Sequence, residues 1–140
     1  MIQAPARQKQ RRNPCNMPDA LVYVVILNWN GIDFLKKFLE NIVQNSENDD
    51  TIVVVADNGS TDGSATWISS AFTSVQVLNL GSNLGFAGGY NKALGLIDAT
   101  YFVLLNSDIE VSPCWLEPLV SFMDENSDAA ACQPKILSYH

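Results

Sequence analysis

Two aspartates, Asp57 and Asp108, each end an apolar run in this chain of 140 residues. Asp57 follows Thr51–Ala56 and opens a glycine-rich turn, and Asp108 comes shortly after Tyr101–Leu105. Apolar runs that stop at polar turns are typical of strands buried on both faces of a parallel sheet. Because such sheets bind ligands at the carboxyl ends of their strands, we expect both carboxylates in one crevice. That crevice suits a polar, phosphorylated or metal-bound ligand.

The sequence leaves two interpretations of Asp57 open. As a binding group, its carboxylate would accept hydrogen bonds from a nucleobase imide or a ribose hydroxyl. As a structural group, it would form a turn, because Asp-Asn-Gly is a strong turn sequence. Asp62 is different: it precedes Gly63 and Ser64 at an expected helix start, so we interpret it as a structural cap.

Asp108 has a similar pair of interpretations. A strand-end carboxylate with a nearby amide suits Mg²⁺ or Mn²⁺, which favour oxygen ligands and usually keep substrate phosphates in their coordination shell. The alternative is a turn that leads toward Ser112. Trp29, at the end of the first apolar run, is either a core residue or a stacking platform for a flat base.

These side chains need a scaffold that brings strand ends together. Apolar runs predict strands at 21–27, 51–56, 75–80, 101–105 and 129–137. Apolar spacings of three and four predict helices at 32–45, after Asp62-Gly63-Ser64, at 90–98, and after Ser112-Pro113 as N-cap and first-turn residues. The alternation predicts an α/β fold with a mostly parallel sheet, helices on both faces and right-handed crossovers.

Charge is unevenly distributed along the chain. Residues 1–20 carry four basic side chains and one acidic one, whereas residues 21–140 carry four basic and 14 acidic ones. We interpret residues 1–20 as a disordered basic tail, with peripheral contact to anionic lipid as the alternative. The acidic body argues against nucleic acid as the main partner, because phosphate backbones attract clustered Lys and Arg.

Cysteine and histidine usage narrows the chemistry further. Cys15, Cys114 and Cys132 are odd in number and lack paired metal-ligand spacing, so we interpret them as reduced thiols of a cytoplasmic protein. His140 is the only histidine, which excludes a multi-histidine metal site within this sequence. No apolar run approaches the roughly 20 residues that a membrane helix needs.

Two nucleotide-binding motifs are missing. A dinucleotide fingerprint, G-x-G-x-x-G, should follow the first strand of a βαβ unit. That strand ends instead in Asn28-Trp29-Asn30-Gly31, and no G-x-x-x-x-G-K-[ST] sequence occurs anywhere. We therefore do not expect a nicotinamide or flavin cofactor.

Four linked segments resemble the donor half of an inverting family 2 glycosyltransferase, which has a Rossmann-like, A-type nucleotide-sugar-binding fold. In order, they are VVILNWNG (24–31), VADNGSTDGS (55–64), NLGFAGGYN (83–91) and LLNSD (104–108). The resemblance covers about residues 21–137. Asn106 replaces the first acid of the family's D-x-D metal motif, as in rhamnosyl- and galactofuranosyl-transferring members. Tyr90 stands where many relatives have an Arg that contacts phosphate.

The resemblance implies roles for the matching residues. Asp57 would bond the base, a uracil or thymine, and Trp29 would lie beside it. Asp108 would hold Mg²⁺ or Mn²⁺, and the loop 83–91 would pass near the ribose and diphosphate. The implied nucleotide-binding residues are Leu27, Asn28, Trp29, Asn30, Asp57, Asn58, Asn83, Gly85, Asn91, Asn106 and Ser107.

The resemblance also implies a reaction, in which a sugar moves with inversion from a UDP- or dTDP-sugar to a glycan or lipid-linked acceptor, as in polysaccharide or cell-wall synthesis. A general base must deprotonate the acceptor hydroxyl. In the family this base lies well beyond the D-x-D segment, so we expect it beyond His140. Residues 21–140 would then be the donor-binding half of a truncated enzyme, unable to turn over alone.

Two other classes of protein remain as alternatives, namely a nucleotidyltransferase-like enzyme and a non-catalytic nucleotide-binding module. A nucleotidyltransferase should carry a Gly-rich, Arg- or Lys-containing loop after its first strand, and a non-catalytic module would bind a nucleotide without chemistry. Apolar surface that a longer enzyme would cover favours a homodimer. The expected location is the cytoplasm, including the inner face of the membrane.

Overall fold

The fold is that of a computed structural model, which describes residues 22–139. The expected basic tail, Leu21 and His140 lie outside the described residues. Along the chain the elements are β1 (Val22–Asn28), α1 (Ile32–Ser46), β2 (Thr51–Asp57), α2 (Ser64–Ala71), β3 (Gln76–Asn79), α3 (Gly85–Leu94), β4 (Tyr101–Leu105) and α4 (Leu116–Glu125). The described strands form one parallel sheet in the order β3-β2-β1-β4. The predicted α/β fold is confirmed.

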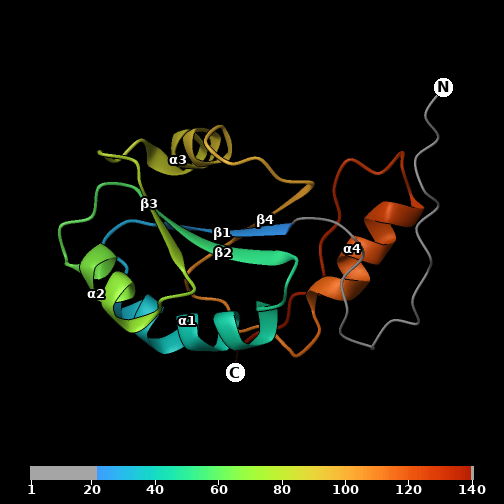
Figure 1. Ribbon diagram of the computed structural model, residues 1–140, viewed down its shortest axis with the longest axis horizontal. Coiled ribbons are helices and arrows are strands. Elements are labelled where there is room, and N and C mark those ends of the chain that lie inside the picture. The colour runs from blue at the N-terminus through green and yellow to red at the C-terminus, as the bar shows by residue number, and fades with distance from the viewer. Residues whose placement is uncertain (1–21, 140) are drawn as a thin grey trace, which may run out of the picture.

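Helices lie on both faces of the sheet, as predicted, but β4 is not buried on both faces, because Phe102 is 37% exposed and Leu104 is 52% exposed. Helices α1 and α2 lie on one face and α3 lies on the other, whereas α4 lies beyond the strands' amino ends (Figure 1). The larger apolar core lies between α1 and alternate residues of β1, including Val24 and Ile26, which are fully buried. The smaller core lies under α3, around Val25, Ala56 and Tyr90. Strands apolar on both faces are therefore explained by helices on both faces.

Helix α3 begins five residues before the predicted start at Tyr90. Glycine is a poor helix former, so a segment with Gly85, Gly88 and Gly89 indicates a loop when only local propensity is considered. In the fold, a Cβ on Gly89 would lie 2.8 Å from a methyl carbon of Leu27. Packing against the sheet therefore requires a small residue here and outweighs its low helix propensity.

Two predictions for the last third of the chain were wrong. Helix α4 begins at Leu116 rather than after Ser112, because Cys114 adopts a left-handed backbone (φ 55°) that interrupts a helix. The segment 129–137 forms no strand, and Ile136 and Leu137 are exposed. A strand needs a partner for its backbone groups, and no described strand pairs with this segment.

The cysteine prediction is corrected at one position. Cys114 is disulfide-bonded, so it is not the reduced thiol that we predicted. Cys132 is an exposed free thiol, and Cys15 lies outside the described residues. Within 22–139, the helices are all too short or too polar to cross a membrane.

The turn after β2 approaches the turn after β3 so closely that one position requires glycine. A Cβ on Gly59 would lie 2.8 Å from the Ser82 Cα and 2.9 Å from its carbonyl carbon. Gly59 also has a left-handed backbone, with φ +80°. Gly81 has a similar φ of +85°, but a Cβ there meets nothing within 4 Å.

We predict that Gly59→Ala destabilises the fold more than Gly81→Ala does. Both variants carry the left-handed strain of about 1–2 kcal/mol, and only Gly59→Ala adds a collision with backbone, worth about 1–3 kcal/mol more. Urea unfolding of both variants measures the difference. Equal losses of unfolding free energy would contradict the close approach of the two turns.

Candidate functional site

The strand order places a crevice at the carboxyl end of β1. The chain leaves β1 toward β2 and β3 through α1 and α2, and then crosses by α3 on the opposite face to reach β4 on the other side of β1 (Figure 1). In open α/β sheets, ligands bind outside the carboxyl ends of the strands at such a change of direction. Asn28 ends β1, Asp57 ends β2 and Asn106 directly follows β4.

Asn28 is a buried polar hub at the centre of this edge. It pairs with Asp57 in the sheet register and is 1% exposed. Its Nδ2 lies 2.9 Å from the Ser64 hydroxyl oxygen, 3.1 Å from that of Ser60 and 3.3 Å from Asp57 Oδ1. Its Oδ1 accepts a hydrogen bond from the Gly31 N–H at 3.2 Å. The Asn28 amide is thus used to tie the ends of β1 and β2 together.

Asp57 is buried but keeps spare acceptor capacity. It is 3% exposed; Oδ1 accepts from Asn28 at 3.3 Å, and Oδ2 accepts from the Ser60 N–H at 3.2 Å. An ionised carboxylate offers about four lone-pair sites, so two donors do not saturate it. The turn interpretation and the binding interpretation therefore hold together: Asp57 organises its turn and can still accept a further hydrogen bond.

Asp62 joins the starts of two helices, which confirms its structural interpretation. Oδ2 accepts from the Ile32 N–H of α1 at 2.9 Å, and Oδ1 accepts from the Ser64 N–H of α2 at 3.0 Å and from the Ser64 hydroxyl at 2.6 Å. Burial acts to raise the pKa of Asp62, but these hydrogen bonds together hold its pKa below its ordinary value. The carboxylate satisfies N–H groups that the helices leave unpaired.

Trp29 and Asn30 form the rim of the crevice. The Trp29 side chain is 57% exposed, so its interpretation as a core residue was wrong. Asn30 has a left-handed backbone (φ 52°), which asparagine tolerates. Its Oδ1 accepts from the Thr61 N–H at 2.7 Å, and its own N–H donates to the Ser60 hydroxyl at 3.0 Å. These bonds fasten the turn after β1 to the turn after β2 and leave the indole in solvent.

Asn58 holds the turn that precedes α3. Its Nδ2 donates to Asn83 Oδ1 and to the Gly85 carbonyl, each at 3.1 Å, and its Oδ1 accepts from the Leu84 N–H at 3.0 Å. Asn83 Oδ1 also accepts from the Gly85 N–H at 2.8 Å. Both asparagines therefore position the turn, and their direct contact with a nucleotide stays a prediction. Asn91 lies exposed further along α3.

Asn106, Ser107 and Asp108 follow β4 on the other side of β1. Asn106 and Asp108 are exposed, and the Ser107 hydroxyl oxygen lies 3.7 Å from the place that a Cβ on Gly31 would take. The turns after β1 and β4 are thus neighbours. Within residues 22–139, no three His, Cys, Asp or Glu side chains gather to hold a metal. One exposed carboxylate with an amide nearby fits an ion that takes most of its ligands from phosphate and water, as Mg²⁺ does.

The sequence analysis assigned no role to Ser60 or Ser64. Both hydroxyls bond the Asn28 amide, and Ser64 also bonds Asp62. The sequence did offer a signal for each serine: Ser60 lies between Asp57 and Asp62, and Ser64 lies at the expected helix start. Local sequence could predict the cap, but the long-range contact with Asn28 depends on how β1 and β2 pair.

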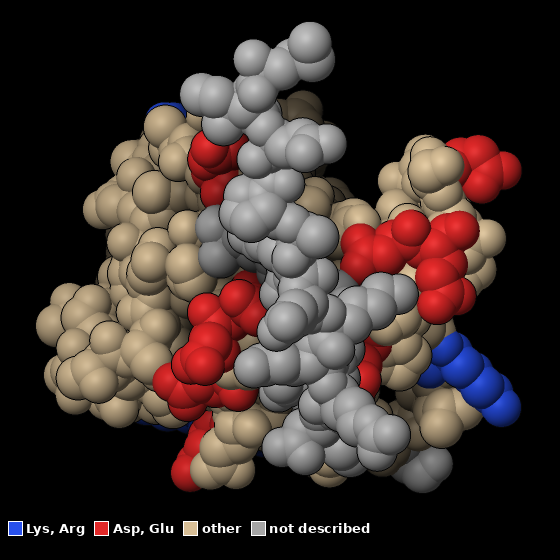
Figure 2. Space-filling model, turned by 45° about the vertical axis from the view of Figure 1, so that its right-hand side comes forward, with Lys and Arg blue, Asp and Glu red and all other residues tan. Residues whose placement is uncertain are grey.

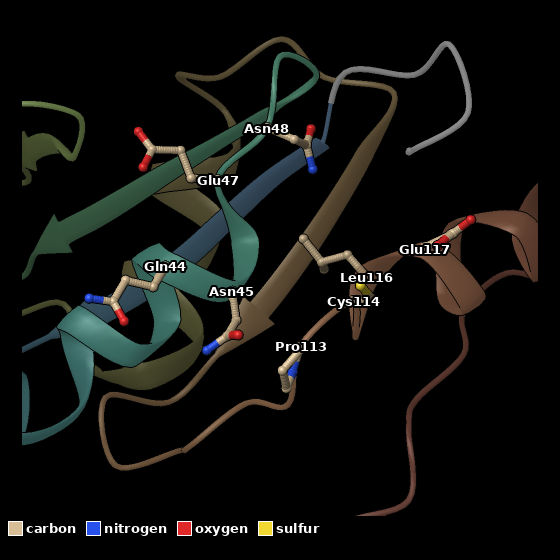
Figure 3. A pocket seen from close by; sticks show the side chains of 8 residues that line it. All are labelled: Gln44, Asn45, Glu47, Asn48, Pro113, Cys114, Leu116 and Glu117. Carbon is tan, nitrogen blue, oxygen red and sulfur yellow. The ribbon is translucent and has the colours of Figure 1, made fainter. Parts of the chain in front are cut away.

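A cavity of about 230 Å³ lies at the opposite end of the sheet, between the end of α1 and the start of α4 (Figure 3). Its lining includes the acidic residues Glu47 and Glu117, whose carboxylates point away from each other in Figure 3. It lies far along the strands from Asp57 and Asp108, so it is separate from the crevice. The face drawn in Figure 2 shows far more acidic than basic colour on the described residues, in keeping with the acidic body.

The sequence model of the family "Glycosyl transferase family 2" matches residues 23–138, so the chain belongs to that family. An uncharacterized glycosyltransferase of Haemophilus influenzae is 26% identical over 114 residues, which cover 79% of this chain and 35% of that protein. The family that the four sequence segments resemble is therefore confirmed.

Solved structures agree at the level of the fold. The mannosyltransferase PcManGT from Pyrobaculum calidifontis, in complex with GDP-Man and Mn²⁺, has a TM-score of 0.66 at 22% identity, over 79% of this chain and 34% of that one. S. aureus TarS 1-349 in complex with UDP-GlcNAc has a TM-score of 0.66 at 22% identity, over 76% and 32%. The chain thus spans about a third of the length of these relatives.

We predict that Asp62→Ala lowers the unfolding free energy by about 0.5–2 kcal/mol at neutral pH, the range for a lost helix cap. Because the pKa of Asp62 is lowered in the folded state, its charged form stabilises the fold above its ordinary pKa of 3.8. That stabilisation is lost as the pH falls below 3.8 toward the folded-state value. Urea unfolding at several pH values measures it.

The matched variant is Asp62→Asn, which keeps the shape and removes the charge. The difference between Asp62→Asn and the unchanged protein should stay constant from pH 6 down to about the ordinary pKa of 3.8, and it should shrink as the pH falls further. A difference that does not vary with pH would show that the charge of Asp62 contributes nothing to the two helix starts.

Proposed function

We propose that this chain is the donor-binding part of an inverting glycosyltransferase that uses a UDP- or dTDP-sugar and transfers the sugar to a glycan or lipid-linked acceptor. One observation carries the proposal: the fold brings Asp57 and Asp108 to the two sides of β1, at the point where the direction of the chain through the sheet reverses. Family membership supports the transfer of a sugar.

In this proposal Asp57 selects the base. The N3–H of uracil or thymine donates a hydrogen bond, and the Asp57 carboxylate has acceptor capacity left after Asn28 and Ser60 are satisfied. Cytosine has an acceptor at N3, so the carboxylate would repel it. Trp29, exposed at the rim, offers an aromatic face beside the base.

Asp108 would hold the metal, with the Asn106 amide as the neighbouring oxygen donor. Mg²⁺ or Mn²⁺ bound there would supply positive charge to the diphosphate as it departs. The PcManGT structure contains Mn²⁺ together with its nucleotide sugar, which supports a metal in this chain as well. The turns after β1 and β3 complete the wall of the donor site.

We place the general base outside the described residues. Two acids that follow Asp108 in the sequence lie away from the crevice. Asp124 accepts a hydrogen bond from the Tyr101 hydroxyl at 2.6 Å, at the amino end of β4, and Glu117 lies beside the distant cavity. The relatives are about three times longer, which leaves room for a base in sequence that this chain does not contain. A transfer assay with purified chain should therefore give no turnover, and many turnovers per chain would contradict this part of the proposal.

Calorimetric titration with UDP and dTDP, each with and without Mn²⁺, tests the proposal directly. We expect binding that strengthens with the metal; we define the metal enhancement as the Kd without Mn²⁺ divided by the Kd with it. A folded chain that binds neither nucleotide would overturn the proposal.

We predict that Asp57→Asn weakens UDP binding by about 1.5–3 kcal/mol, or roughly tenfold and more, because a charged hydrogen bond is lost. CDP provides the control. The asparagine amide can donate to cytosine N3, so the preference for UDP over CDP should narrow in the variant. An unchanged preference would show that Asp57 does not read the base.

We predict that Asp108→Asn abolishes most of the metal enhancement and leaves UDP binding without metal unchanged, because the only acid of the Asn106–Asp108 turn is removed. Glu110→Gln is the matched control, since Glu110 is also exposed and lies two residues further along. Titration of both variants with UDP, with and without Mn²⁺, measures the effect. Equal loss in the two variants would indicate a general effect of surface charge.

A further inference from the structure

Tyr90, which stands where many relatives have an Arg that contacts phosphate, lies buried beneath the crevice. Its side chain is 3% exposed and packs edge-on against Phe86, with ring centroids 5.0 Å apart. Its hydroxyl donates to the Leu105 carbonyl at 3.1 Å and also has a hydrogen bond with the backbone of Leu27. The hydroxyl therefore contacts the last residue of β4 and a residue near the end of β1.

The contact with Leu105 matters because Leu105 is the last residue of β4. The sheet register pairs β1 with β4 only as far as Ile26 and Leu105. The next residues are Asn106, Ser107 and Asp108, so the Tyr90 hydroxyl holds the last backbone carbonyl before the acidic turn. Strand β4 is also at the edge of the described sheet, with β1 as its neighbour, so no second strand holds this end within the described residues.

We propose that Tyr90 is a positioning residue for the metal side of the donor site: its hydroxyl fixes the carboxyl end of β4 and so sets the direction of the Asn106–Asp108 turn. This inference rests on the proposed metal role of Asp108. Burial raises the pKa of Tyr90, against the opposite effect of its bond with the Leu27 backbone, so the hydroxyl keeps its proton at neutral pH and remains a donor. Helix α3, whose Gly89 lies close to Leu27 of β1 and to Asn58 directly after β2, thereby connects the two sides of the crevice.

Tyr90→Phe removes the hydroxyl and keeps the ring. We expect the metal enhancement of UDP binding to fall by about threefold to tenfold, the range for one neutral hydrogen bond, while UDP binding without metal stays within about twofold. Tyr101→Phe is the matched control, because it also removes a tyrosine hydroxyl that forms a hydrogen bond at β4. The bond lost in this variant, to Asp124, lies at the amino end of the strand. We expect its metal enhancement to be unchanged.

Amide hydrogen exchange without any ligand is the second readout. In Tyr90→Phe the amides at the carboxyl end of β4, which the β1–β4 ladder protects, should exchange faster than in the unchanged protein, while those at its amino end should not. This result would support the inference even if the unchanged protein showed no metal enhancement, which would contradict the proposed metal role alone. Unchanged exchange at the carboxyl end of β4, or a global loss of fold in Tyr90→Phe, would overturn the positioning role.

Discussion

The buried hydrogen bonds around Asn28 are the interaction on which the crevice depends. One amide, 1% exposed, joins Asp57 at the end of β2 with two serine hydroxyls of the turn and helix that follow. Asp62 adds the start of α1 to the same group through Ile32. In a low-dielectric interior, a polar cluster of this kind is stable only when its members are satisfied, so each bond constrains the others. The ends of β1 and β2 and the starts of α1 and α2 are therefore fixed as one unit.

The polar residues of the crevice fall into two groups with different roles. Asn28, Asn58 and Asp62 use their side chains on neighbouring turns and helix starts, and so form the frame. Asp57 belongs to this frame and still has acceptor capacity for a ligand, whereas Trp29 and Asp108 face solvent. Residues of the same family motif can thus have different roles, some holding the turns in place and others remaining open to a ligand. Asp57, Trp29 and Asp108 are therefore the residues that can still contact a ligand, because Asn28, Asn58 and Asp62 already use their side chains within the frame.

The sequence by itself determined the fold class, the first two strands and α1, because long apolar runs and spacings of three and four record burial directly. It also gave the acids at the strand ends and the cap at Asp62. It misplaced α3 and α4, since Gly85 and Gly89 oppose a helix locally and the left-handed Cys114 could not be read from composition. The run at 129–137 has the character of a strand, yet no described strand pairs with it.

Only the tertiary structure decided which residues meet. That Ser60 and Ser64 bond Asn28, more than 30 residues earlier, depends on the parallel register of β1 with β2. That the Tyr90 hydroxyl reaches Leu105 depends on α3 crossing the face opposite α1 and α2. Periodicity encodes which side of an element is buried, but not what lies against it. The partner is set by strand order and crossover, and these follow from the packing of the whole sheet.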